Sequence, residues 1–99
     1  MKTFTHIRFN PNGDSYDVYF VDDKPLMQGD YYDDKVTDMF AGIRIYLAVM
    51  FNEEFSLVKI EAETKEVNEL WYRHCQFDIN ETLSKYLKRI GKDFNLTQK

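Results

Sequence analysis

Residues 3–21, TFTHIRFNPNGDSYDVYFV, contain two runs of β-branched and aromatic residues separated by a short polar segment. Asn12-Gly13 in that segment favours the positive φ angles of a tight turn, so the stretch predicts an N-terminal β-hairpin. Side chains alternate along a strand, so the second strand should have two different faces. One face would carry Tyr16, Val18 and Phe20, and the other would carry Asp17, Tyr19 and Val21.

The hairpin is followed by residues 22–34, DDKPLMQGDYYDD, and then by a long apolar pattern. Pro25 and Gly29 break regular structure, so the first segment predicts a surface loop. From Val36 onward apolar residues recur at three- and four-residue spacing, which predicts an amphipathic helix ending near residue 52. The apolar positions are Val36, Met39, Phe40, Ile43, Leu47 and Met50, with Ala41, Ile45, Ala48 and Val49 widening the stripe. Such a wide stripe predicts one long central helix covered on more than one side.

The second half of the chain is predicted to repeat the order of two strands and a helix. FSLVKIEA, residues 55–62, predicts a third strand. Residues 64–76 fit either an aromatic strand or a helix, and periodicity does not separate the two. We favour a second hairpin that turns near residue 64, because the following residues lead into a helix-start signal at Asn80. The last helix is expected over about 81–90, with Gly91 ending it.

These elements predict an α+β fold in ββαββα order, with an antiparallel sheet from two β-hairpins packed on two helices. The chain has 99 residues, of which 43% are hydrophobic and 16% aromatic, which suits a single domain over residues 1–99. The N-terminus has no signal-peptide h-region, the apolar run at 45–51 is too short to span a bilayer, and Cys75 has no second cysteine to pair with. A cytoplasmic location is therefore expected.

Charge is divided unevenly along the chain. Residues 1–84 hold 16 acidic and 8 basic side chains, whereas residues 85–99 hold 5 basic side chains and 1 acidic one. Residues 10–40 alone contain eight aspartates against two lysines. An acidic body attracts basic molecules and repels nucleic acid and anionic membranes, so a basic protein is the expected partner and a membrane is not.

The acidic loop within residues 29–40, GDYYDDKVTDMF, is the predicted contact surface. Its two tyrosines offer a large amphipathic area, and the aspartates around them favour a basic protein surface. The predicted partner-binding residues are Asp30, Tyr31, Tyr32, Asp33 and Asp34 in this loop and Asp17 in the first hairpin, with Tyr16 and Tyr19 as further candidates. The alternative is a solvated acidic face in which Asp33 or Asp34 caps the helix that follows. A calcium loop is excluded because Lys35 stands where the sixth-position glycine would be needed.

A second candidate surface is the basic end of the chain, where Lys85, Lys88, Arg89 and Lys92 recur at helical spacing. These side chains would line one exposed face and could contact phosphates or an acidic partner. The alternative is that basic side chains in a last helical turn only complement the negative end of the helix dipole.

No catalytic, cofactor or metal site is predicted. His74 and Cys75 are neighbours, and on a strand such neighbours point to opposite faces. His6 could approach Cys75 only if its strand lay alongside. The sequence contains no phosphate-binding loop, zinc-ligand spacing or nucleophile elbow. A buried structural thiol is therefore the expected role of Cys75.

We therefore expect a small acidic inhibitory binding protein, not an enzyme. Nucleases and related enzymes carry basic clefts, with which an acidic aromatic patch can compete. An immunity protein for a bacterial nuclease-type toxin is the leading expectation, and a phage anti-defence protein is the next. The alternative is a nucleic-acid-associated regulator that binds through the basic C-terminal helix. The oligomeric state stays open at this point.

Overall fold

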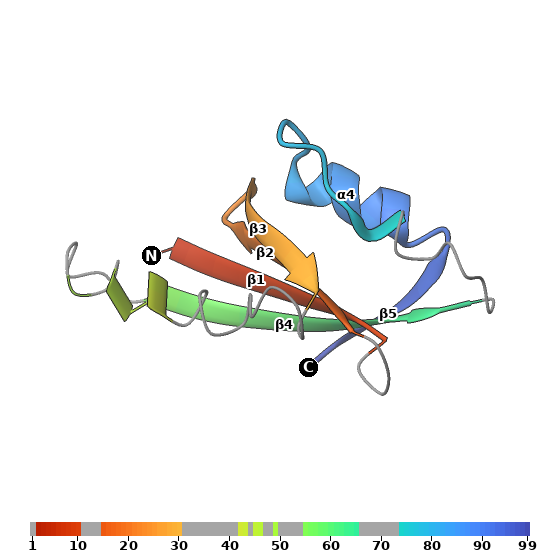
Figure 1. Ribbon diagram of the computed structural model, residues 1–99, viewed down its shortest axis with the longest axis horizontal. Coiled ribbons are helices and arrows are strands. Elements are labelled where there is room, and N and C mark those ends of the chain that lie inside the picture. The colour runs from red at the N-terminus through yellow and green to blue at the C-terminus, as the bar shows by residue number, and fades with distance from the viewer. Residues whose placement is uncertain are drawn as a thin grey trace.

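The computed structural model describes residues 2–10, 15–30, 42–43, 45–46, 49, 55–65 and 74–99. Five strands form one mixed sheet in the order β3-β2-β1-β4-β5, and α4 lies over one of its faces (Figure 1). The bounds are β1 Lys2–Phe9, β2 Tyr16–Val21, β3 Lys24–Asp30, β4 Phe55–Thr64, α4 Leu83–Ile90 and β5 Phe94–Gln98.

Strand β1 is the centre of the sheet because it carries apolar side chains toward both faces. It pairs antiparallel with β2, where Ile7 lies opposite Val18, and parallel with β4, where Ile7 lies opposite Ile60. Ile7 is buried on the side of α4, whereas Phe4 is buried in a second cluster on the other side. A strand that is buried on both faces belongs in the interior of a sheet.

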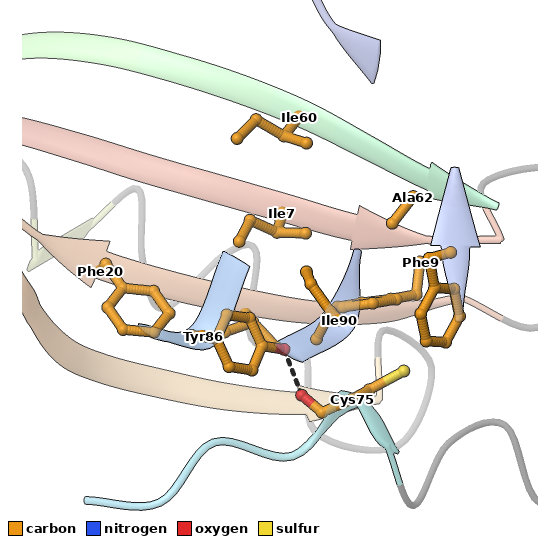
Figure 2. Close-up of a cluster of buried hydrophobic side chains, with 10 residues drawn as sticks. Ile7, Phe9, Phe20, Ile60, Ala62, Cys75, Tyr86 and Ile90 are labelled. Carbon is orange, nitrogen blue, oxygen red and sulfur yellow. Dashed lines mark hydrogen bonds between the residues drawn. The ribbon is translucent and has the colours of Figure 1, made fainter. Parts of the chain in front are cut away.

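Helix α4 supplies the other half of the main core. The Thr82 side chain caps its N-terminus by accepting a hydrogen bond from the backbone N–H of Lys85, and the helix ends at Gly91. Figure 2 shows Tyr86 and Ile90 of α4 pointing at the sheet, with the Tyr86 hydroxyl donating to the Cys75 carbonyl. The fully or nearly fully buried members of this cluster are Ile7, Phe9, Val18, Phe20, Ile60, Ala62, Cys75, Tyr86, Ile90 and Phe94. Burial stabilises the fold by about 1.5–3 kcal/mol for each large apolar side chain.

The N-terminal hairpin, the strand at 55–62 and the last helix are confirmed, but the predicted ββαββα fold with an antiparallel sheet is wrong. The sheet is mixed because β1 and β4 run parallel. The predicted loop after β2 is a third strand, β3. Pro25 is tolerated there because β3 is an edge strand, and its pairing with β2 shifts register between Tyr19 and Phe20.

The predicted second hairpin is also wrong. The neighbour of β4 beyond β1 is β5, and His74 and Cys75 have helical backbone conformation, so they are not part of a strand. Strand β5 escaped prediction because it is short, and its apolar alternation consists of Phe94 and Leu96 alone, of which only Phe94 is buried. The remainder of the ambiguous segment, residues 66–73, lies outside the described residues.

The predicted central helix is helical at each described position, which are Gly42, Ile43, Ile45, Tyr46 and Val49. The prediction that it is covered on more than one side is wrong at Ile45 and Val49, whose exposed fractions are 62% and 76%. Apolar spacing identifies a helix, but it does not say how much of the stripe other elements cover. The other positions of this helix lie outside the part of the chain that the structure describes.

Candidate functional site

A buried ionic cluster lies on the face of the sheet opposite α4. Asp17 of β2 is fully buried, and its Oδ1 accepts hydrogen bonds from Arg8 Nε at 2.8 Å and His6 Nε2 at 2.6 Å. The strands place these groups together, because His6 and Arg8 share one face of β1 and Arg8 lies opposite Asp17. The His6 ring also stacks on Tyr19, with 4.4 Å between ring centroids.

Two opposing effects set the protonation of Asp17. Burial alone would raise the pKa of its carboxyl group, but hydrogen bonds from His6 and Arg8 outweigh burial and hold the pKa below its ordinary value. The carboxylate is therefore charged at neutral pH and fixes the orientation of both donors. A carboxylate that orients a histidine also occurs in general-base catalysis. Here, however, His6 is only 8% exposed, so the arrangement suits joining two strands better than meeting a substrate.

A second ionic cluster joins α4 to the segment before it. Arg89 donates from Nε and Nη2 to the two carboxylate oxygens of Glu81, each at 2.9 Å. It also donates to the backbone carbonyls of His74 and Gln76. The hydrogen bonds from Arg89 lower the pKa of Glu81, and Glu81 in turn raises the pKa of Arg89. The guanidinium group thus holds the chain from His74 to Glu81 against the helix.

Beside this second cluster the surface forms an open hollow of about 620 Å³, lined by Gln76, Phe77, Asp78, Asn80, Glu81 and Arg89. Its Arg89 and Glu81 side chains bond to one another, so neither presents an uncompensated charge to a ligand. The side chain of Gln28 accepts from the backbone N–H of Phe77 at 2.9 Å, which ties the wall of the hollow to β3. The hollow is thus formed by contacts that hold the chain from His74 to Glu81 against α4 and β3.

The structure changes the predicted partner surface. Asp17 is fully buried between Arg8 and His6, so its carboxylate does not lie on the surface, and the candidate Tyr19 is fully buried as well. Tyr16 is half-buried and packs against the main core. Asp30 is the last residue of edge strand β3 and lies opposite Tyr16. Tyr31, Tyr32, Asp33 and Asp34 lie outside the described residues.

The predicted basic surface is retained in part. Lys85 and Lys88 are exposed on α4, and Lys92 is exposed in the turn that follows. Arg89 does not belong to this surface, because its guanidinium group is bonded to Glu81 and to two backbone carbonyls.

The structure does not bring Cys75 and His6 together. Cys75 is fully buried in the core cluster on the α4 side, whereas His6 lies on the opposite face of β1. Burial raises the pKa of the Cys75 thiol well above its ordinary value, so the thiol is protonated at neutral pH. His74 is exposed beside Asp93, with 3.7 Å between its Nδ1 and the carboxylate. Cys75 is therefore a buried core thiol, as the sequence predicts.

The cluster around Asp17 was not predicted, although the sequence contains a signal for it. A two-residue turn assumed at Asn12-Gly13 would have predicted Arg8 opposite Asp17, with His6 on the same face two residues away, and the structure has this register. Opposite charges in facing strand positions predict a cross-strand ion pair. Treating Asp17 as part of an acidic surface overlooked that pairing.

No protein-family model, no curated protein and no solved structure matches this chain. The part of the chain that the structure describes brings no three His, Cys, Asp or Glu side chains close enough to hold a metal ion. Within the same residues, no helix has both the length and the apolar character needed to cross a membrane.

Proposed function

We propose that this protein binds a basic protein partner and inhibits it, as an immunity protein does for a nuclease-type toxin or a phage anti-defence protein does for a host enzyme. The observation that carries the proposal is the charge distribution, with eight aspartates and two lysines in residues 10–40. Such an excess steers encounter with a basic surface and competes with an anionic substrate.

The position of the acidic residues on the sheet supports this proposal. Asp22 and Asp23 are exposed in the turn before edge strand β3, and Asp30 stands at the end of the same strand. The acidic run at 33–34 follows a few residues later. Among the aspartates whose exposure the structure describes, Asp17 is buried, and Asp22 and Asp23 are exposed. An edge of the sheet flanked by carboxylates suits a partner with a basic cleft.

The test begins with the native partner. The tagged protein is purified from its native source, and whatever remains bound at moderate salt is identified by mass spectrometry and assayed for inhibition. The variant Asp33→Lys/Asp34→Lys should then bind at least tenfold more weakly, mainly through slower association. The matched control is Glu63→Lys/Asp93→Lys, which changes the charge equally at two exposed positions near the β5 edge, on the other side of the sheet from β3, and should leave affinity within about twofold. Equal losses in both variants would refute the assigned surface.

A nucleic-acid regulator is the second candidate, favoured by the three exposed lysines Lys85, Lys88 and Lys92 on one side of α4 and its following turn. The discriminating assay is a gel shift at low salt with the variant Lys85→Glu/Lys88→Glu. Arg89 stays unchanged in this variant, because its substitution would also break its bonds to Glu81 and to the segment before α4. A shift that this variant abolishes would favour the regulator over the inhibitor.

A further inference from the structure

The two edges of the sheet are not equally protected against pairing with another strand. Edge strand β3 contains Pro25, which has no N–H to donate, and a register shift bends its pairing with β2. Edge strand β5, FNLTQ, has no proline, no charged residue and no shift in its pairing with β4. Uncharged, regular edge strands are the ones that accept a further strand.

The hydrogen bonds at the two ends of β5 show which of its backbone groups face outward. The N–H of Lys65 donates to the carbonyl of Asp93 at 3.0 Å, and the N–H of Lys99 donates to the carbonyl of Lys59 at 2.8 Å. Backbone groups of an antiparallel strand alternate between its two sides. Asn95 and Thr97 therefore bond to β4 together with Asp93 and Lys99. The N–H and C=O groups of Phe94, Leu96 and Gln98 point away from the sheet.

The residues around these outward groups are also accessible. Asn95, Leu96, Thr97 and Gln98 are all exposed, and the exposed fraction of Leu96 is 38%. The four consecutive exposed residues make this edge of the described sheet accessible to a second extended strand.

We propose that β5 pairs antiparallel with β5 of a second copy of this chain, about a two-fold axis at Leu96. In this register Leu96 faces Leu96 of the second copy, and Phe94 faces Gln98. Asp93 then lies opposite Lys99 of the second copy, and this attraction occurs twice because the interface is symmetric. Other antiparallel registers also let the outward backbone groups of two β5 strands bond to one another. None of them places opposite charges across from each other at both ends of the paired strands. The two sheets would join into one continuous sheet in which the β3 edges lie at the far ends.

Because the contact is confined to one short strand, the dimer should be in equilibrium with monomer. Sedimentation velocity over a hundredfold range of protein concentration should show a shift from monomer to dimer. Over the same range, hydrogen exchange at the amides of Leu96 and Gln98 should slow, whereas exchange at Thr97, already bonded within the sheet, should not. Monomer at every concentration would overturn the proposal.

Charge exchange tests the register. Asp93→Lys and Lys99→Asp should each raise the dimer dissociation constant at least tenfold, because each puts like charges opposite one another at two places. The double variant Asp93→Lys/Lys99→Asp should restore it to within about threefold of the original value. A dimer that the single changes weaken but the double variant does not restore would refute this register.

A side-chain change on the same edge provides an independent check. Leu96→Lys should bring two lysines together at the axis and abolish the dimer. The matched control is Leu57→Lys, an exposed leucine on β4 with a side-chain exposure similar to that of Leu96, and it should leave the dimer intact. Circular dichroism of both variants confirms that the fold is retained, and equal weakening by both would place the interface elsewhere.

Discussion

In the part of the chain that the structure describes, two arginine–carboxylate pairs each join separate segments, and they differ in how far they are removed from water. The Asp17 side chain is fully buried and that of Arg8 is 23% exposed, whereas the Glu81 side chain is 12% exposed and that of Arg89 is 41% exposed. A fully buried carboxylate that loses its donors has no water to replace them, whereas water reaches a pair whose arginine is partly exposed. The same chemical pair should therefore be essential to folding on one face of the sheet and only helpful on the other.

The largest effect is expected from Asp17→Ala. This change removes the fully buried carboxylate that Arg8 and His6 share as an acceptor, and the free energy of unfolding should fall by about 3–5 kcal/mol. Urea denaturation followed by circular dichroism measures the loss. Asp23→Ala, at an exposed aspartate in the turn after β2, is the control and should change stability by less than about 0.5 kcal/mol. If Asp17→Ala lowers the free energy of unfolding no more than Asp23→Ala does, the cluster around Asp17 does not stabilise the fold.

Acid should weaken the protein through the same carboxylate, by less than its deletion does. The pKa of Asp17 is lower in the folded protein than its ordinary value of 3.8, so its contribution to stability is complete above that value and is lost as pH falls through the folded pKa. Glu81 acts in the same direction below its ordinary value of 4.5. Unfolding free energies measured from pH 6 down to pH 2 should decline below about pH 4, and Asp17→Asn should flatten that decline. If the unfolding free energy of Asp17→Asn declines as steeply with falling pH, groups other than Asp17 cause the decline.

The smallest effects are expected at the exposed pair. Arg89→Met removes four hydrogen bonds, but water can replace most of them, so the unfolding free energy should fall by about 1–2 kcal/mol. Glu81→Gln keeps an acceptor for Arg89 and should cost about 0.5 kcal/mol. Thermal and urea unfolding of both variants provide the measurement. If Arg89→Met lowers the free energy of unfolding as much as Asp17→Ala does, the two clusters do not differ in their importance for folding.

The parts of this fold that the sequence predicts are those specified by neighbouring residues. The hairpin of β1 and β2 follows from Asn12-Gly13 and alternating side chains, and α4 follows from its apolar spacing and the glycine at its end. The parallel pairing of β1 with β4 could not be predicted, because the two strands are far apart in the chain and no local pattern names the partner of a strand. Strand β3 was predicted to be a loop because it contains a proline and a glycine, which occur more often in loops than in edge strands.

The candidate site divides in the same way. The exposed lysines of α4 were predictable from helical spacing, but the loss of Arg89 from that surface depends on Glu81 and on carbonyls that only the folded chain brings near. Asp17 was predicted to lie on the surface because only its charge was considered, and not the residue opposite it on the neighbouring strand. Pairing partners counted outward from the turn would have placed it opposite Arg8.

The parallel pairing of β1 with β4 also determines how the chain must behave while it is being synthesised. Lys2 of β1 lies opposite Phe55 of β4, so β1 leaves the ribosome well before its second neighbour exists. At about 5–20 residues per second, one edge of the central strand waits on the order of 3–10 s for β4. Helix α4 comes later still, so Ile7 and Phe9 remain uncovered on that side until most of the chain has emerged. The nascent protein thus exposes an apolar strand with an unpaired edge for seconds. Chaperones that bind extended apolar segments are suited to protect it during that interval.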